Sequence, residues 1–551
     1  MRSLSDYPKM YVMNSLLMKL RENNVFISVE KNELKVRFNG SSIREDLLEE
    51  IKTNKDRLVS YLVNYNKQSV AIKSAAVSGR GGFPLSSSQF RLWVLSQVEE
   101  GNIAYNMPGM YFFEGDLNND ALDFAFAALI SRHESLRTIF KENDQGEARQ
   151  FIQSPDASGF AIRHCDLRQE ADKETVLKLR VRQECVKPFN LAEGPLMRAI
   201  LFRIEDKKWL FTCVMHHIIS DGWSMHIVKR ELLQQYHAFI SGETDPLPPL
   251  RIQYKDYAVW QQEIFSRGAL NEHKTWWLKQ FEGELPVLQL RGHFTRPMLK
   301  TYNGEAICVV IDPETTKGFK QLIQKRNATL FMGLLGVVAV LLNAYSDQED
   351  IIIGTPIIGR EHMDLENQIG FFLNTLPLRI RFTGEESYDG LLEKIRRTTL
   401  DAFEHQIYPF DRLVDELHLH RDISRNPLFD VLVILQNTKI GHDAHRQNNE
   451  SLRVSGYGDR PILTSKLDLT FDFNETAGGI QLSLVYNSDI YDKPFAEQLG
   501  VHFNRLTRAV TERSFISIQG LEYMDADEMK HHITTYNETV TAFAVPVSDE
   551  F

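Results

Sequence analysis

At the centre of this sequence stands the stretch Met215-His216-His217-Ile218-Ile219-Ser220-Asp221-Gly222-Trp223-Ser224. It follows residues 209–214, WLFTCV, a run of aromatic and β-branched side chains that predicts a buried strand. Successive side chains on a strand point to opposite faces, so His216 and His217 are expected to face in different directions. Only one of the two can reach a given cleft.

The strand is expected to break at residues 220–222, and a helix is expected to follow. From Ser224 onward apolar residues recur at helical spacing, at Ile227, Val228, Leu232, Leu233 and Tyr236. The amides near Gly222 then lie close to a helix N-terminus. A candidate histidine base, a constrained turn and free backbone donors are thereby brought together. The alternative is two core histidines beside a solvated turn aspartate.

Composition restricts the class of protein. A chain of 551 residues is long enough for three or four structural units, and its 43% hydrophobic and 25% charged residues are typical of a soluble globular protein. The net charge of -11 disfavours nucleic-acid binding, because no long basic run offsets it. The longest apolar run, Leu330 to Leu342, is shorter than the roughly 18 residues of a membrane span and predicts a buried helix.

No secretion signal is apparent at the N-terminus, so the cytoplasm is the expected location and no membrane partner is expected. The four cysteines have neither metal-ligand spacing nor the density of a disulfide framework: Cys165, Cys185, Cys213 and Cys308. We therefore expect no metal site.

Residues 1–66 form a predicted separate unit with the order α-β-β-α-α. A helical stripe, Val12, Leu16, Leu17 and Leu20, precedes a hairpin at 25–29 and 34–38. Ser42 followed by Glu45 predicts a capped helix with Leu47, Leu48 and Ile51, and the pattern continues through Leu58, Tyr61 and Leu62. The alternative is an N-terminal extension packed on the main body. Residues 67–82 end in Gly-Arg-Gly-Gly and predict a flexible linker.

Seven segments of the main body, in order, resemble the motifs of nonribosomal peptide synthetase condensation domains: 85–95, 132–140, 215–224, 254–261, 369–376, 405–411 with 421–429, and 465–469. In the first of them Ser86 and Gln89 also predict a helix capping box. Each segment is a weak signal alone, but seven in the right order make chance negligible. Residues 291–297, RGHFTRP, depart from the family's usual loop at that place.

The resemblance implies an α+β fold of two chloramphenicol-acetyltransferase-like lobes, arranged as a V-shaped pseudodimer with the site between them. The expected N-lobe is 83–265 and the expected C-lobe is 266–515. Residues 516–551 resemble the lead-in to an adenylation domain that the sequence does not contain.

The first 66 residues, in turn, resemble the tubulysin-type N-terminal docking domain of megasynthetases. Such domains are similar to others that capture the C-terminal tail of an upstream synthetase as an added strand beside the hairpin. The expected docking strand here is Leu34, Lys35, Val36 and Arg37.

Condensation domains join a donor acyl thioester to the amine of an acceptor aminoacyl thioester. The resemblance therefore implies an enzyme that forms amide bonds and has no cofactor of its own. It acts on phosphopantetheine thioesters carried by upstream and downstream peptidyl carrier proteins, and it works beside the adenylation domain of its own polypeptide. Leu376 and the Asp-Gly-Trp-Ser run resemble the subtype that accepts an L-configured donor.

The resemblance also assigns roles to residues. His217 is expected to face the tunnel and to orient the acceptor amine, taking its proton as the bond forms. A free α-amine titrates near 8, so positioning is needed more than a strong base. Gly222 is the candidate oxyanion donor. The expected structural residues are His216, Asp221 and its partner Arg360, and the expected tunnel-lining residues are Asn374 and Trp223, the latter with core packing as the alternative.

Other members of the same superfamily fit the residues less well. No Glu-Gly-His-Gly-Arg-like motif of epimerisation domains occurs, and heterocyclisation domains carry aspartates where this chain has His216 and His217. A starter domain that N-acylates with a fatty acyl-CoA is the enzymatic alternative, which the docking unit argues against. An inactive scaffold that only binds carriers is the alternative from another class, which the intact motifs disfavour.

Overall fold

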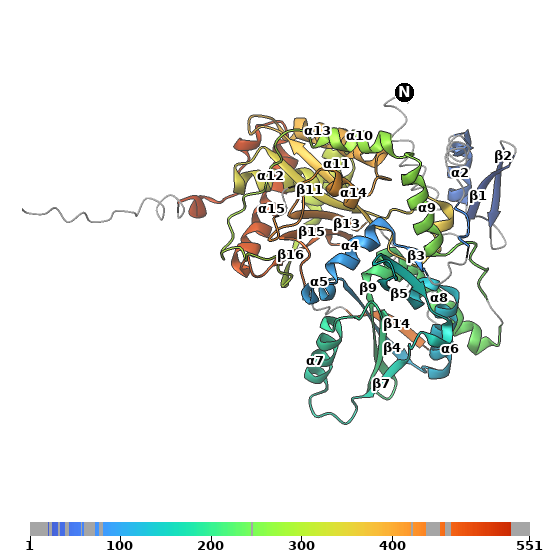
Figure 1. The fold of residues 1–551 in the computed structure, drawn as a ribbon. Helices are drawn as coiled ribbons and strands as arrows, with labels where there is room; N and C mark the ends of the chain where they lie inside the picture. The colour runs from blue at the N-terminus through green and yellow to red at the C-terminus, as the bar shows by residue number, and fades with distance from the viewer. Residues whose placement is uncertain are drawn as a thin grey trace, which may run out of the picture. The chain divides into compact units, whose positions relative to one another are not determined.

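The computed structural model describes residues 20, 25–30, 33–38, 43, 45–56, 58–59, 72–76, 81–243, 246–419, 422–436, 452–457 and 464–530. The chain divides into two compact units, Met1–Ser74 with His362–Glu366, and Ala75–Glu361 with Asn367–Phe551. Figure 1 shows the elements of both. Some predicted features lie outside the described residues, namely the stripe at Val12, Leu16 and Leu17, the cap at Ser42, and Tyr61, Leu62 and Arg421.

The small N-terminal unit is built on a hairpin and a helix. Strands β1 (Val25–Glu30) and β2 (Glu33–Phe38) pair antiparallel, and α2 (Glu45–Thr53) follows them. Their buried core consists of Leu20, Val25, Ile27, Leu47, Ile51 and Leu58. Alternation along β2 leaves Leu34 and Val36 partly buried against this core and Lys35 exposed. The predicted hairpin is thus confirmed.

The first half of the large unit forms a five-stranded sheet in the order β14-β4-β9-β8-β7. Four strands come from this half of the chain, β4 (Asn106–Gly115), β7 (Ile162–Asp166), β8 (Met197–Glu205) and β9 (Lys208–His216). Helices α6 (Asn119–Arg132) and α8 (Gly222–Ser241) pack together, and a small sheet is formed by β3 (Phe83–Pro84), β6 (Ala148–Ile152) and β5 (Thr138–Glu142). We call this part the N-lobe.

Three further helices of the N-lobe are α4 (Ser87–Leu95), α5 (Glu99–Ala104) and α7 (Lys173–Val186). The predicted capping box at the start of α4 is confirmed, because Ser86 Oγ accepts from the Gln89 amide and the Ser86 amide donates to Gln89 Oε1. Helices α9 (Tyr254–Ser266) and α10 (Asn271–Gln280) then lead into the second half.

The second half, here called the C-lobe, carries a six-stranded sheet in the order β10-β16-β15-β13-β11-β12. The strands are β10 (Gly304–Ile311), β11 (Asp350–Ile357), β12 (Asn374–Arg381), β13 (Val431–Gln436), β15 (Leu469–Thr476) and β16 (Gly479–Asn487). Its helices are α11 (Pro313–Lys325), α12 (Leu330–Ser346), α13 (Tyr388–Glu404), α14 (Phe410–Glu416) and α15 (Lys493–Arg513).

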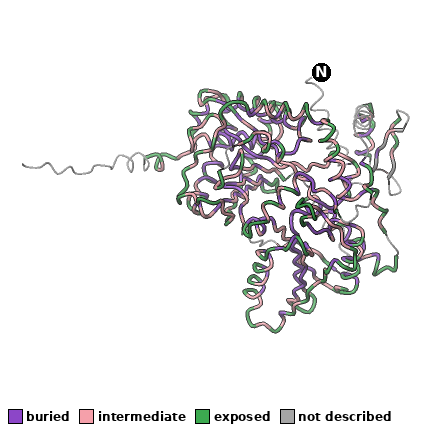
Figure 2. The backbone as a smooth tube through the Cα atoms, in the orientation of Figure 1, coloured by how far each residue is buried: buried purple, intermediate pink, exposed green. Residues whose placement is uncertain are grey.

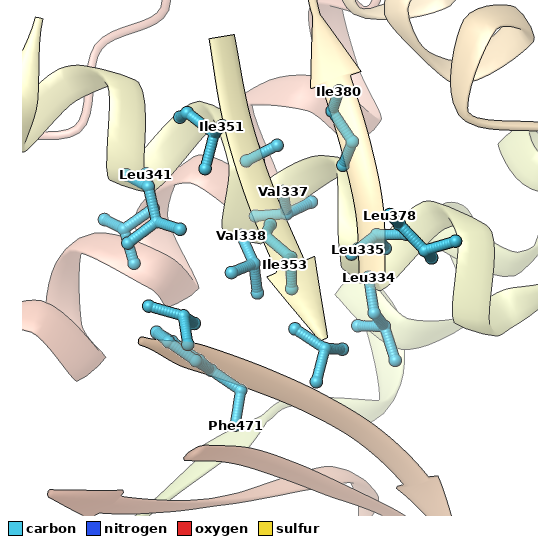
Figure 3. Close-up of a cluster of buried hydrophobic side chains, with 14 of the residues drawn as sticks. Leu334, Leu335, Val337, Val338, Leu341, Ile351, Ile353, Leu378, Ile380 and Phe471 are labelled. Atoms are coloured by element: carbon cyan, nitrogen blue, oxygen red, sulfur yellow. The ribbon is translucent and has the colours of Figure 1, made fainter. Parts of the chain in front are cut away.

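Helix α12 is the core of the C-lobe. Every residue from Met332 to Leu342 is buried, which confirms the helix predicted from the apolar run. Figure 3 shows its leucines and valines among Ile351, Ile353, Leu378, Ile380 and Phe471 of the sheet. Among the described residues no single helix is long and apolar enough to cross a membrane, and only the pair α11–α12, bent by 106°, passes that test by length and composition.

One strand departs from the expected division of the chain into lobes. β14 (Leu452–Gly456) belongs by sequence to the second half, yet it pairs antiparallel with β4 of the N-lobe, Leu452 opposite Gly115. Figure 1 shows β14 beside β4. The second half therefore supplies an edge strand to the sheet of the first. Figure 2 shows the buried residues, in purple, gathered in the interior and the exposed residues, in green, along the outside.

Candidate functional site

The two histidines lie where β9 ends. The strand stops at His216, and His217–Ile219 form a short 3-10 helix before Asp221 caps α8. The break was expected at residues 220–222, and it comes earlier because His216 Nδ1 accepts a hydrogen bond from the Ile218 amide at 3.2 Å, which closes the turn. The two imidazoles have different surroundings. His216 packs edge-on against Phe189, and His217 against Phe371.

Hydrogen bonds fix opposite tautomers on the two rings. His217 Nδ1 lies 2.8 Å from the Ser220 carbonyl oxygen. A carbonyl can only accept, so Nδ1 carries the proton and Nε2 keeps a lone pair. For His216 the amide of Ile218 is the donor, so Nδ1 holds the lone pair and Nε2 carries the proton.

Burial keeps both rings neutral. Desolvation, and then the charge of Lys466, lower the pKa of His217 well below its usual 6.5 and that of His216 to about 3. A histidine that is neutral at pH 7 with Nε2 free to accept can orient an amine and receive its proton.

Asp221 is fully buried and all of its hydrogen bonds are made within the protein. Its Oδ1 accepts from the amide and the hydroxyl of Ser224, both at 2.7 Å, and from Arg360 Nη2 at 3.0 Å. Its Oδ2 accepts from the Phe372 amide at 3.1 Å. One carboxylate therefore caps α8 and ties the N-lobe to residues of the C-lobe half of the chain.

Arg360 completes this junction from the other side. It donates to the Gln368 carbonyl at 2.6 Å and to Ser224 Oγ at 2.8 Å, and its guanidinium lies 4.1 Å from the centroid of the Phe372 ring. Ser224 Oγ also accepts from the Gly370 amide at 3.1 Å. The ion pair is embedded in a network that spans both lobes, which is the geometry in which a buried pair is well satisfied.

Gly222 begins α8, so its amide has no partner within the helix. A Cβ at this position would meet no heavy atom within 4 Å, so the backbone does not require a glycine there for space. Trp223, the next residue, is partly buried and packs against the N-lobe core.

The side-chain amide of Asn374 makes four hydrogen bonds within the protein. Its Nδ2 donates to the carbonyls of Gln406 and Tyr408, and its Oδ1 accepts from the amides of Thr375 and Phe410. All four hydrogen bonds are made within the C-lobe, where they hold the segment before α14 against the start of β12. The predicted place of Asn374 in a tunnel lining stays a prediction, and within the described residues these four hydrogen bonds use the donors and acceptors of its side chain.

The sequence patterns assigned no role to Tyr254, Lys300 or Lys466. Tyr254 Oη lies 2.9 Å from Ser86 Oγ and donates to the Phe371 carbonyl at 2.6 Å, so it braces the segment that contacts His217. Lys466 lies within the 465–469 motif, so its place in that motif was an available signal. No group of three or more metal-ligating side chains occurs in the part of the chain that the structure describes.

Comparison with known proteins gives concordant matches. The family model "Condensation domain" matches residues 80–532. A plipastatin synthase of Bacillus subtilis (strain 168) is 39% identical over 462 residues, which are 83% of this chain and 17% of that protein. The chain thus spans about a sixth of that relative's length.

Two solved structures share the fold. The X-domain from teicoplanin biosynthesis superposes with a TM-score of 0.74 at 24% identity, covering 82% of this chain and 99% of that one. The four-domain nonribosomal peptide synthetase AB3403 superposes with a TM-score of 0.73 at 22% identity, and the match covers 84% of this chain and 35% of that one. The expected α+β condensation-domain fold is confirmed.

Proposed function

Because this chain belongs to the condensation-domain family of nonribosomal peptide synthetases, whose members form amide bonds, we propose that His217 directs condensation between two carrier-bound thioesters. The family acts on phosphopantetheine thioesters of carrier domains and uses no cofactor of its own. The observation that carries the proposal is the neutral His217, with Nε2 as an acceptor, at the junction of the two lobes.

In the proposed reaction the acceptor amine attacks the donor thioester carbonyl. A carbon–nitrogen bond forms, the carbon–sulfur bond breaks, and the proton lost by the amine passes through His217 Nε2 to the departing thiolate. The Gly222 amide donates to the oxyanion that develops on the carbonyl oxygen. Asp221 and Arg360 keep the lobes joined while this happens. Trp223 lines the approach to the site.

The donor reaches this site from another polypeptide. The tail of an upstream synthetase adds as a strand beside the hairpin, next to Leu34, Lys35, Val36 and Arg37. The donor residue is of the L configuration. The acceptor comes from the downstream carrier, which the adenylation domain of the same cytoplasmic polypeptide loads. In this proposal residues 1–66 are the docking domain, 67–82 a linker, 83–265 and 266–515 the two lobes, and 516–551 the lead-in to the adenylation domain.

Intact-mass analysis of carrier-bound products tests this proposal. Donor-loaded and acceptor-loaded carriers are mixed with wild type, with His217→Ala, and with His164→Ala as a control at an exposed histidine of the same lobe. We expect transfer in wild type and control and its collapse in His217→Ala. Product that forms only from a fatty acyl-CoA offered as donor would identify a starter domain. Carrier binding without any product would identify a scaffold.

Docking is tested separately, with the same assay and an upstream carrier that keeps or lacks its C-terminal tail. We expect the tail to lower the donor concentration needed for half-maximal transfer. Lys35→Glu, which reverses a charge on the exposed face of β2, should change the tail's effect without changing transfer from a tailless carrier. An identical response with and without the tail would contradict the docking role.

A further inference from the structure

Three cations lie near one another, and one of them, Lys466, is close enough to His217 to lower the pKa of its imidazole. Arg91 of α4 lies 3.2 Å from Asp411 Oδ1 and its guanidinium is 5.3 Å from the Phe410 ring centroid. Lys466 Nζ lies 4.7 Å from the centroid of the Tyr105 ring. Lys300 Nζ lies 4.8 Å from the Tyr302 ring centroid. The cluster draws Arg91 from the N-lobe and both lysines from the C-lobe half of the chain.

Asn426 holds the two lysines in one arrangement. Its side-chain oxygen accepts from Lys300 Nζ, and its side-chain nitrogen donates to the Lys466 carbonyl at 3.2 Å. The Lys300 amide is fixed in turn by the Ile423 carbonyl at 2.9 Å. The lysines are therefore anchored through their backbones, and each ammonium group lies beside an aromatic ring, that of Lys300 also hydrogen-bonded to Asn426.

The carboxylates near the lysines are already paired. Asp411 binds Arg91, Asp430 binds Arg425, and Asp468 binds Arg296. Across the described residues, neither Lys300 nor Lys466 has a carboxylate within ion-pair distance.

Burial and the charge of Arg91 lower the pKa of Lys300 to about 7 and that of Lys466 to about 8. Partly buried ammonium groups without a directly paired carboxylate are unfavourable even with Asp430 and Asp468 nearby, and a bound anion would stabilise them.

The nature of that anion follows from the neighbours of the cluster. The Tyr105 ring carries Lys466 on its face and packs edge-on to His217 with centroids 6.2 Å apart, so a single aromatic ring separates Lys466 from the proposed base. That separation is comparable to the length of an amino-acid side chain, which points to the side chain of a substrate that reacts at His217. The phosphate of a pantetheine arm is less suited, since the whole pantetheine chain separates it from the reacting thioester.

We propose that Lys300 and Lys466 bind a carboxylate on the substrate side chain, so that this domain condenses an acidic amino acid, as donor or as acceptor. This inference rests on the proposed condensation activity and adds a substrate class to it. The two ammonium groups supply charge-assisted hydrogen bonds, and Arg91 adds to the positive potential. A neutral isostere such as glutamine leaves the lysines without a counterion and binds less well.

The test compares glutamyl with glutaminyl substrates, offered as N-acetylcysteamine thioesters that contain no phosphate. One arm varies the acceptor and the other varies the donor, each with a leucyl partner. In wild type we expect one arm to show a preference in kcat/KM for the glutamyl substrate of about tenfold or more. That arm identifies whether the carboxylate belongs to the donor or to the acceptor.

Variants separate the lysines from general effects. Lys300→Met and Lys466→Met should bring the glutamyl-to-glutaminyl ratio of kcat/KM to about one. Lys493→Met removes an exposed lysine of α15 and should leave the ratio as in wild type. Thermal melting shows whether Lys466→Met folds. If it does not, the glutamyl-to-glutaminyl ratio of Lys300→Met decides the test.

Two results would overturn the inference alone, and a third would overturn the proposed function as well. Equal rates for glutamyl and glutaminyl substrates in both arms, with amide formed, would remove the acidic specificity and leave the proposed function intact. A loss in Lys300→Met that appears only with phosphopantetheinylated carriers, whatever the side chain, would assign the lysines to phosphate. Absence of amide from every thioester would instead reject the proposed function, and this inference with it.

Discussion

Two charged regions at the junction of the lobes differ in how their charges are balanced. The Asp221–Arg360 pair has a partner for both carboxylate oxygens and lies inside a network that reaches Ser224 and Phe372. Lys300 and Lys466 sit among aromatic rings with the nearby carboxylates taken by arginines. The first arrangement holds the lobes together. The second leaves a charge that a substrate can match.

The adjacent histidines repeat this contrast on a smaller scale. His216 Nδ1 accepts a hydrogen bond from the Ile218 amide and thereby shapes the turn. His217 Nδ1 donates to the Ser220 carbonyl, which leaves its Nε2 as an acceptor. The protein itself uses the acceptor of His216, whereas the acceptor of His217 remains available, which makes His217 the candidate for chemistry.

The largest effect is expected at the saturated pair. Asp221→Asn leaves the guanidinium of Arg360 buried without its counterion, and breaking such a pair lowers the free energy of unfolding by about 3–5 kcal/mol. Urea unfolding followed by tryptophan fluorescence measures the change. Asp206→Asn, which removes an exposed partner of Arg168, should leave the transition unchanged. An Asp221→Asn variant that is as stable as wild type but inactive would show that Asp221 takes part in the reaction rather than in holding the lobes together.

A pH-dependent effect is expected at His216. The pKa of its imidazole is about 3 in the folded protein and near 6.5 in the unfolded chain, so the unfolded chain binds more protons below pH 6.5. The stability that His216 contributes is therefore complete above pH 6.5 and is lost as the pH falls from there toward 3. The loss reaches at most about 1.4 kcal/mol per pH unit.

The variant His216→Asn tests this effect because its oxygen can still accept from the Ile218 amide but cannot take up the proton. Thermal and urea unfolding between about pH 7 and about pH 4 should show a shallower decline in the variant than in wild type. His164→Asn, at an exposed site, serves as the control. Equal slopes in wild type and His216→Asn would show that burial of His216 is not the source of the decline.

The smallest effect on stability is expected at Gly222. A methyl group there meets open space, so Gly222→Ala should change the free energy of unfolding by less than about 0.5 kcal/mol. If the amide faces the reacting carbonyl, the same methyl group obstructs the acyl group and lowers the single-turnover rate. If Gly222→Ala changes neither the single-turnover rate nor the stability, the Gly222 amide is not the donor to the oxyanion.

Local patterns in the sequence were enough to predict several elements. The hairpin at 25–38, the buried helix from Leu330 and the capping box at Ser86 follow from periodicity and cap residues within one segment. The strand break was misplaced because it depends on one hydrogen bond from Ile218 to His216.

Other features depend on contacts between distant parts of the chain, which a local pattern does not contain. The pairing of β14 with β4 joins segments more than 300 residues apart. The saturation of Asn374 depends on residues 406–410, and the lack of counterions at Lys300 and Lys466 depends on which arginines reach Asp430 and Asp468.

The central claim is that His217 acts as a neutral acceptor, and the single-turnover rate of amide formation against pH tests it most directly. From about pH 6 to about pH 9, wild type should exceed His217→Ala by roughly 10²–10⁴-fold. That factor should stay constant, because the pKa of His217 lies well below this range, and the acceptor amine, Lys300 and Lys466 titrate in both proteins alike. A factor that collapses as the pH falls through 6.5 would show that His217 becomes protonated there, and would contradict the account.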